Sequence, residues 1–132
     1  MVLKVVLFDL DGTLVDVRDA AWKLFEETNR EFELGVDSQD KFLQLSETNF
    51  FVGLADLCED DSKAQAVAEH FMDLVRRRYN PPFIPGMVEV VREFAACSTL
   101  AILSSNMLDT IRRILASGCI TGFFPHILAG DD

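Results

Sequence analysis

The 132-residue sequence predicts an α/β fold in which a parallel sheet is interrupted, after its first strand, by a helical segment. Three short apolar runs, at residues 3–8, 100–103 and 126–129, have the length and composition of buried strands. Between these runs, apolar residues recur every three or four positions, as they do in amphipathic helices. Strands that alternate with helices are typical of parallel sheets joined by right-handed crossovers.

The first strand is predicted at residues 3–8, which are almost continuously apolar and rich in β-branched side chains. Such a run is typical of a strand that is buried on both faces of a parallel sheet. The run ends abruptly at Asp9, so we expect this strand to lead directly into an acidic loop at its carboxyl end.

Residues 16–80 are predicted to form an inserted helical domain, so that the α/β core consists of residues 1–15 and 81–132. The insert shows three helical stretches, the middle one at residues 42–57. The last stretch is expected to begin after Ser62, a favourable N-cap residue. It must end before the Pro81-Pro82 pair, because proline has no backbone N–H to donate.

The rest of the core is predicted to follow in the order helix, strand, helix, strand. Gly86 is placed to open the first of these helices and Gly118 to end the second. Asn106 follows the strand at 100–103 and is a favourable N-cap for the second helix. The last strand, at 126–129, ends at Gly130 and two aspartates.

Composition excludes several classes of function. The formal net charge of −10 would repel nucleic acids and anionic lipids, so neither is an expected partner. No apolar run approaches the roughly 18 residues that a membrane-spanning helix requires. The apolar run after Lys4 is also too short for a signal peptide, so we expect a cytoplasmic protein with no membrane association. Three isolated cysteines, at positions 58, 97 and 119, are expected to be buried thiols.

Each predicted strand ends in polar residues: Asp9 and Asp11 after the first, residues 104–106 after the second and residues 131–132 after the third. Open α/β sheets bind their ligands at the carboxyl ends of the strands. Two carboxylates in a D-x-D arrangement repel each other unless a hard cation such as Mg²⁺ lies between them. Gly12 permits backbone angles that would turn N–H groups toward an anion. These patterns predict a site for a metal and an anion.

Four segments resemble motifs of the haloacid dehalogenase superfamily. Residues 8–16, Phe-Asp-Leu-Asp-Gly-Thr-Leu-Val-Asp, resemble its first motif. Residues 84–86, Ile-Pro-Gly, resemble the junction at which a helical cap returns to the core in the phosphoglycolate phosphatase-like subgroup. Residues 100–106 resemble the second motif, and residues 123–132 the approach to the third. The resemblance implies a Rossmann-like parallel sheet with an inserted α-helical cap.

The resemblance also implies a reaction: Mg²⁺-dependent hydrolysis of a small phosphorylated metabolite through an aspartyl-phosphate intermediate. Asp9 is then the nucleophile, and Asp11 is the general acid and base. Both residues would hold the metal, Asp9 through its carboxylate and Asp11 through its backbone carbonyl. Four residues would bind or frame the phosphate: Gly12, Thr13, Ser105 and Asn106.

The sequence departs from the family pattern at its third and fourth motifs. Neither the lysine of the third motif nor the acidic fourth motif occurs in these 132 residues, which indicates an incomplete core truncated after the third strand. Loss of one such electrostatic group costs on the order of 10²–10³ in rate, so we expect impaired activity. We also expect the edge of the first strand, residues 5–7, to be exposed and to support a homo-oligomer or binding of a complementing chain.

Two other functions remain open at this stage. One is a catalytically inactive remnant or half-protein that binds Mg²⁺ or phosphate, or pairs with another chain. The other is a phospho-acceptor domain of the receiver type, which also uses clustered aspartates on a parallel sheet. The long helical insert at residues 16–79 disfavours the receiver type, because a receiver alternates strands with single helices from its start.

Overall fold

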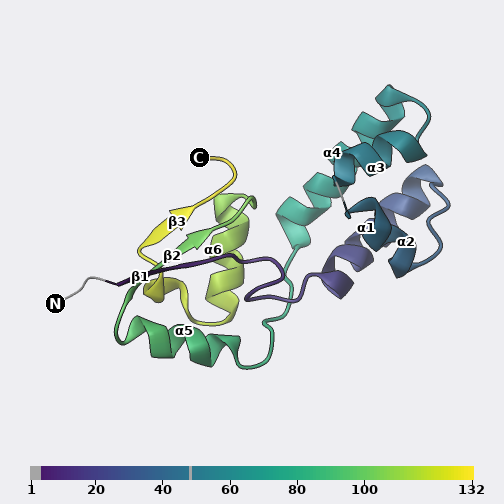
Figure 1. Cartoon of the computed structure of the whole chain (residues 1–132). Helices are drawn as coiled ribbons and strands as arrows, with labels where there is room; N and C mark the ends of the chain where they lie inside the picture. The colour runs from purple at the N-terminus through teal and green to yellow at the C-terminus, as the bar shows by residue number, and fades with distance from the viewer. Residues whose placement is uncertain (1–3, 48) are drawn as a thin grey trace. The chain divides into compact units, whose positions relative to one another are not determined.

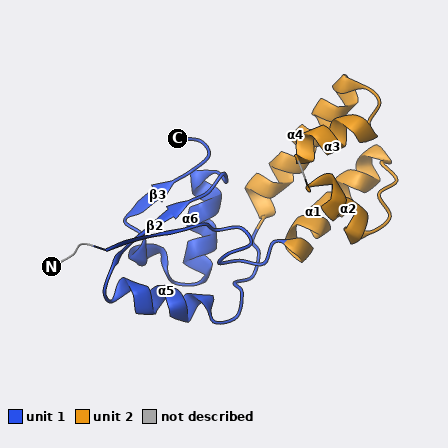
Figure 2. Cartoon of the chain, viewed as in Figure 1, with its two compact units in different colours: residues 1–17, 80–132 blue, residues 18–79 orange. Residues whose placement is uncertain are grey.

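The computed structural model describes residues 4–47 and 49–132, which form two compact units (Figure 2). Unit 1, the core, comprises residues 1–17 and 80–132, and unit 2, the cap, comprises residues 18–79. The core contains β1 (Val5–Phe8), α5 (Met87–Ala95), β2 (Thr99–Leu103), α6 (Leu108–Ser117), the 3₁₀ turn η1 (Thr121–Phe123) and β3 (His126–Leu128) (Figure 1). The cap contains α1 (Arg18–Phe32), α2 (Gln39–Leu45), α3 (Phe50–Leu57) and α4 (Asp61–Arg78).

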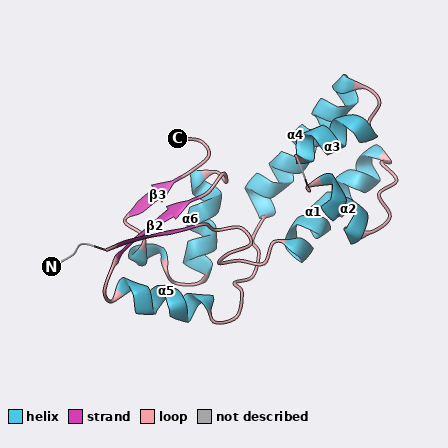
Figure 3. Ribbon diagram, in the orientation of Figure 1, coloured by secondary structure: helices cyan, strands magenta, loops and turns pink. Residues whose placement is uncertain are grey.

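The core is built on three parallel strands in the order β1-β2-β3, so the predicted α/β fold is confirmed (Figure 3). Val6 is aligned with Leu100, and Phe8 with Ile102. Because side chains alternate along a strand, these four residues share one face of the sheet. On that face the ring of Phe8 packs edge-on against Phe94 of α5. Leu3, at the start of the predicted first strand, lies outside the described residues.

The opposite face of the sheet is exposed. Val5 and Leu7 of β1 are 59% and 54% exposed, and Leu103 and Leu128 on the neighbouring strands are 50% and 53% exposed. The prediction that the first strand is buried on both faces is therefore wrong. Within the core, α5 packs on the other face, where Phe94 contacts Phe8, and Val5, Leu7, Leu103 and Leu128 remain in contact with solvent.

The cap is held together by an aromatic cluster. Phe25 of α1 is fully buried and stacks on Phe42 of α2, with ring centroids 4.8 Å apart. Phe50 and Phe71, from α3 and α4, meet Phe25 edge-on. One aromatic side chain from each helix thus contributes to the centre of the cap, an arrangement that favours mutual burial of large apolar surfaces.

The helix boundaries in the cap differ from the prediction in two places. The predicted middle stretch is two helices, α2 and α3, and Asn49 caps the second by accepting from the backbone N–H of Phe51. The last helix begins before Ser62, because the side chain of Asp60 accepts from the Ser62 N–H and serves as the N-cap. A carboxylate is the better cap here, since it also interacts favourably with the helix dipole.

A surface ion pair links two helices of the cap. Arg78 of α4 donates to the carboxylate of Glu27 in α1. The hydrogen bond from Arg78 holds the pKa of Glu27 below its ordinary value. Because both groups are exposed, the pair contributes little to stability and is screened by salt.

The two chain segments that join core and cap are paired with each other. The Asp16 N–H donates to the Pro82 carbonyl at 2.9 Å, and the Ile84 N–H donates to the Leu14 carbonyl at 2.9 Å. Val15 and Phe83 form an antiparallel bridge between them. The ends of the cap segment are thus fixed to the loop that follows β1.

The three cysteines and the ends of α5 and α6 complete the comparison with the sequence. Gly86 caps α5 with a left-handed backbone, and Gly118 ends α6, as predicted. Cys58 is buried as predicted, but Cys97 and Cys119 are exposed because they lie in the turns after α5 and α6. Among the described residues, no helix combines the length and apolar composition that crossing a membrane requires.

Candidate active site

The loop after β1 is a tight turn anchored by two fully buried leucines, Leu10 and Leu14. The Leu10 carbonyl accepts from the N–H of Leu14 at 3.0 Å and from that of Thr13 at 3.3 Å. Gly12 has a φ of +78°, a left-handed conformation that glycine adopts without strain. The Gly12 N–H donates to the Val15 carbonyl at 2.9 Å. The N–H groups of Gly12 and Thr13 therefore close the turn rather than face an anion, contrary to the expectation for Gly12.

Asp9 is exposed at the carboxyl end of β1, where its Oδ1 accepts from the Leu10 N–H at 2.8 Å. It lines an open hollow of about 560 Å³ together with Leu7, Leu103, Ser104 and Ser105. The structure thus brings Asp9 and Ser105 to one hollow, although 95 residues separate them in the chain. Two of the exposed leucines of the sheet line the same hollow, so the apolar face continues into the site.

Asp11 is half-buried, and its Oδ2 accepts from Nδ2 of Asn106 at 2.7 Å. Asn106 is not the N-cap of α6, which corrects the prediction. The helix begins at Leu108, and its N-cap, Met107, makes no side-chain hydrogen bond. The Leu108 N–H donates instead to Oδ1 of Asp131 at 2.9 Å. The carboxylate of Asp131, in the loop after β3, therefore caps α6, and the Asn106 amide donates to the carboxylate of Asp11.

The loops after the strands are linked through Asn106 and its neighbours. The Asn106 N–H donates to Oγ of the buried Ser104 at 3.1 Å, and the Asn106 carbonyl accepts from the Gly130 N–H at 2.8 Å. A Cβ atom at Gly130 would lie 2.1 Å from the Ser105 carbonyl oxygen, so only glycine fits there. The sequence analysis did not predict this contact between the loops after β2 and β3. The only residue that could have indicated it is the glycine between the last strand and the two aspartates.

The site is acidic. Unit 1 carries eight aspartates and glutamates but four lysines and arginines. Among the described residues, no lysine or arginine lines the hollow beside Asp9. A phosphate dianion at Asp9 would therefore need a cation from elsewhere to offset the local negative charge. In the described part of the chain, no three histidine, cysteine, aspartate or glutamate side chains converge to hold a metal ion.

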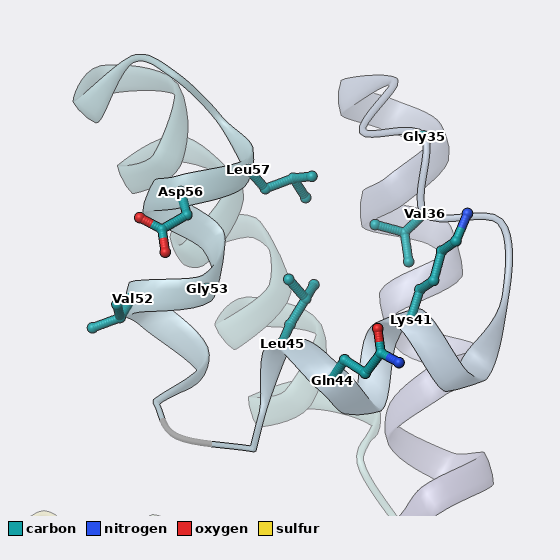
Figure 4. A pocket seen from close by; sticks show the side chains of 9 residues that line it. All are labelled: Gly35, Val36, Lys41, Gln44, Leu45, Val52, Gly53, Asp56 and Leu57. Atoms are coloured by element: carbon teal, nitrogen blue, oxygen red, sulfur yellow. The ribbon is translucent and has the colours of Figure 1, made fainter.

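A second open hollow, of about 590 Å³, lies in the cap between α2 and α3 (Figure 4). Its apolar lining includes Leu45, Val52 and Leu57. Lys41 lines it as well and is paired with Asp37 at 2.7 Å, a hydrogen bond that lowers the pKa of the Asp37 carboxyl. None of the predicted site residues lines this hollow, so the candidate chemistry lies at the strand ends of the core.

Comparison with known proteins identifies a family and several relatives of the chain. The family model described as haloacid dehalogenase-like hydrolase matches residues 6–132. A phosphoglycolate phosphatase of Aquifex aeolicus is 27% identical over 139 residues, which cover 98% of this chain and 62% of that protein. The pyrophosphatase PpaX of Oceanobacillus iheyensis is 27% identical over 137 residues, covering 100% of this chain and 62% of that protein. The chain thus spans about 62% of the length of these relatives.

Solved structures share the fold at lower identity. A haloacid dehalogenase-like hydrolase from Streptococcus pneumoniae superposes with a TM-score of 0.83 at 18% identity, over 96% of this chain and 61% of that chain. A predicted phosphoglycolate phosphatase from Haemophilus somnus superposes with a TM-score of 0.77 at 17% identity, over 97% of this chain and 63% of that chain. These structures show the fold, and the family match over residues 6–132 establishes that the chain belongs to the haloacid dehalogenase-like hydrolase family.

Proposed function

We propose that this chain carries the catalytic loops of a cytoplasmic, Mg²⁺-dependent hydrolase of small phosphorylated metabolites. The observation that carries the proposal is the convergence of Asp9 and Ser105, from two different strand ends, on one open hollow. The names of the relatives, a phosphoglycolate phosphatase and a pyrophosphatase, support hydrolysis of a phosphate ester or anhydride.

Asp9 is the proposed nucleophile because its exposed carboxylate lies at the hollow. A carboxylate oxygen attacks phosphorus, the bond from phosphorus to the ester oxygen breaks, and an aspartyl phosphate forms. Asp11 gives a proton to the departing ester oxygen. It then takes a proton from water, whose oxygen attacks the aspartyl phosphate and releases inorganic phosphate and the Asp9 carboxylate. The two aspartates thereby divide one difficult hydrolysis into two steps.

Hydroxyl groups are the proposed phosphate donors. Thr13, in the turn after β1, and Ser105, in the loop after β2, are exposed, and each side chain carries one O–H donor. The N–H groups of Gly12 and Thr13 are engaged within the turn. Gly12 therefore shapes the loop, and the side chains of Thr13 and Ser105 contact the phosphoryl oxygens.

Mg²⁺ fits the donor set of the site. Asp9 offers carboxylate oxygen, Asp11 offers its backbone carbonyl, and Mg²⁺ prefers such hard oxygen ligands together with water. When bound, the ion supplies positive charge beside the phosphate, which the described side chains at the hollow do not. Because no third acidic group converges there among the described residues, we expect weak binding.

The test is to titrate MgCl₂ into the protein by calorimetry and to follow release of phosphate from p-nitrophenyl phosphate. We expect Mg²⁺-dependent heat that is lost in Asp9→Asn, and phosphate release that stops when EDTA is added. Absence of heat, or heat unchanged in Asp9→Asn, would contradict the proposed metal site. Heat without phosphate release would favour the second candidate, an inactive Mg²⁺-binding remnant, which the lack of a described basic side chain at the hollow supports.

The exposed face of the sheet suggests a partner. Leu7, Leu103 and Leu128 form an apolar surface next to β1, which pairs with β2 alone among the described strands. Unpaired strand edges beside apolar surface favour pairing with further polypeptide. We therefore propose that this face and the β1 edge bind a second copy or a complementing chain, which would also close the hollow at Asp9.

Light scattering at low micromolar concentration tests this association. We expect a mass above the 14.8 kDa of one chain, and a return toward that mass in Leu128→Lys, which places a charge on the exposed face. The matched control is Val52→Lys, at an equally exposed apolar position in the cap, which should leave the mass unchanged. A monodisperse 14.8 kDa wild-type protein that unfolds cooperatively would refute the proposal.

A further inference from the structure

We infer that Asn106 is a positioning residue for Asp11: its carboxamide holds the Asp11 carboxylate in the orientation that proton transfer needs. The contact itself is a hydrogen bond of 2.7 Å from Nδ2 of Asn106 to Oδ2 of Asp11, between two half-buried side chains. The role of Asp11 in proton transfer rests on the proposed function.

Asn106 is itself held in place by groups on both sides. Its N–H donates to the hydroxyl of Ser104, which is 6% exposed, and its carbonyl accepts from the N–H of Gly130. Gly130 approaches Ser105 so closely that no side chain fits between them. These contacts tie the backbone of Asn106 to the ends of β2 and β3. Because asparagine has a short side chain, a fixed backbone leaves its carboxamide few positions.

A structural role as a helix cap does not account for this arrangement. A capping asparagine accepts a backbone N–H through its side-chain oxygen. Here the first N–H of α6 is taken by Asp131, and the group that contacts Asp11 is the Asn106 nitrogen, a donor. A carboxyl oxygen that carries no proton accepts hydrogen bonds, so Oδ2 of Asp11 is the acceptor and Nδ2 of Asn106 is the donor.

The chemistry of the amide suits this position. A neutral amide orients the carboxylate while adding no net charge to the site. Asn106 thus directs Asp11 without neutralising it, and it does so from a loop on a different strand from the one that carries Asp11.

The first experiment tests the hydrogen bond between Asn106 and Asp11 and does not depend on enzymatic activity. We expect the side-chain amide protons of Asn106, followed by NMR, to exchange with solvent at least about tenfold more slowly than those of the exposed Asn80. In Asp11→Ala this protection should fall to the level of Asn80. Exchange of Asn106 as fast as that of Asn80 in the wild type, or protection that survives in Asp11→Ala, would overturn the inference.

The second experiment measures how substitution of Asn106 changes kcat and KM for p-nitrophenyl phosphate. We expect Asn106→Ala to lower kcat about tenfold to a hundredfold, with KM changed less than about twofold, because a misoriented acid slows the chemical step more than binding. Asn80→Ala is the matched control and should leave both constants unchanged. Equal kcat values in the two variants would refute the positioning role. If the wild type releases no phosphate, the proposed function fails, whereas the exchange comparison still decides whether Asn106 holds Asp11.

Discussion

Replacing Asp9 by asparagine is expected to reduce phosphate release on the order of 10⁴-fold or more, since removal of a covalent nucleophile has effects of this size. The carboxamide has the shape of the carboxylate but cannot form the aspartyl phosphate. Its Oδ1 can still accept from the Leu10 N–H, which the wild-type side chain does at 2.8 Å. Asp9→Asn should therefore fold normally, and the loss of activity reports the chemical role alone.

Two neighbouring substitutions serve as comparisons in the same assay. Asp11→Asn should reduce activity strongly because it removes the proposed proton carrier. Ser105→Ala should have a smaller effect, since one hydroxyl among several phosphate donors is lost. If the wild type and Asp9→Asn released phosphate at the same rate, the activity would come from a contaminating enzyme or from another residue.

Phe25→Ala is expected to destabilise the cap by about 3–5 kcal/mol, the usual cost of truncating a fully buried phenylalanine. The ring of Phe25 contacts those of Phe42, Phe50 and Phe71, so its removal opens a cavity that three helices border. The single tryptophan, Trp22, lies 6.4 Å from the Phe25 ring, centroid to centroid. Its fluorescence during urea denaturation therefore reports unfolding of this unit.

The control for this measurement is Phe51→Ala. Phe51 packs against Phe50 at 5.9 Å between centroids, but it is 54% exposed. Its truncation removes less apolar surface from the protein interior and should cost less than about 1.5 kcal/mol. Equal destabilisation by the two substitutions would mean that the aromatic cluster is not the centre of the cap.

Local chemistry predicts much of this fold. The apolar runs at residues 100–103 and 126–129 coincide with β2 and β3, the second run extending one residue past the end of β3 at Leu128. Short runs of β-branched and aliphatic residues between turn signals favour strands. Gly86 and Gly118 mark helix ends correctly, since the backbone needs of a helix terminus are local. The convergence of Asp9 and Ser105 could also be predicted from the order of strands and helices along the chain, because parallel strands bring their carboxyl ends to the same edge of the sheet.

Long-range competition explains what the sequence could not predict. Asn106 is a good N-cap by local rules, yet Asp131 caps α6 and releases the Asn106 amide for Asp11, a partner 95 residues away. No residue near Asn106 in the sequence indicates that Asp131 caps α6 in its place. The exposed face of β1 is a similar case, because Val5 and Leu7 have the composition of buried residues whatever covers them.

The pairing of the two chain segments between core and cap has a consequence for changes within the cap. Because Asp16 and Pro82 are joined by a backbone hydrogen bond, as are Leu14 and Ile84, the core holds both ends of the cap segment in the manner of a hairpin stem. Leu10 and Leu14, which anchor the turn that follows Asp9, are fully buried within the core. We therefore expect changes of length or sequence between residues 17 and 80 to leave the hydrogen bonds of the loop after β1 intact, since insertions are tolerated where the two ends of the inserted segment lie close together.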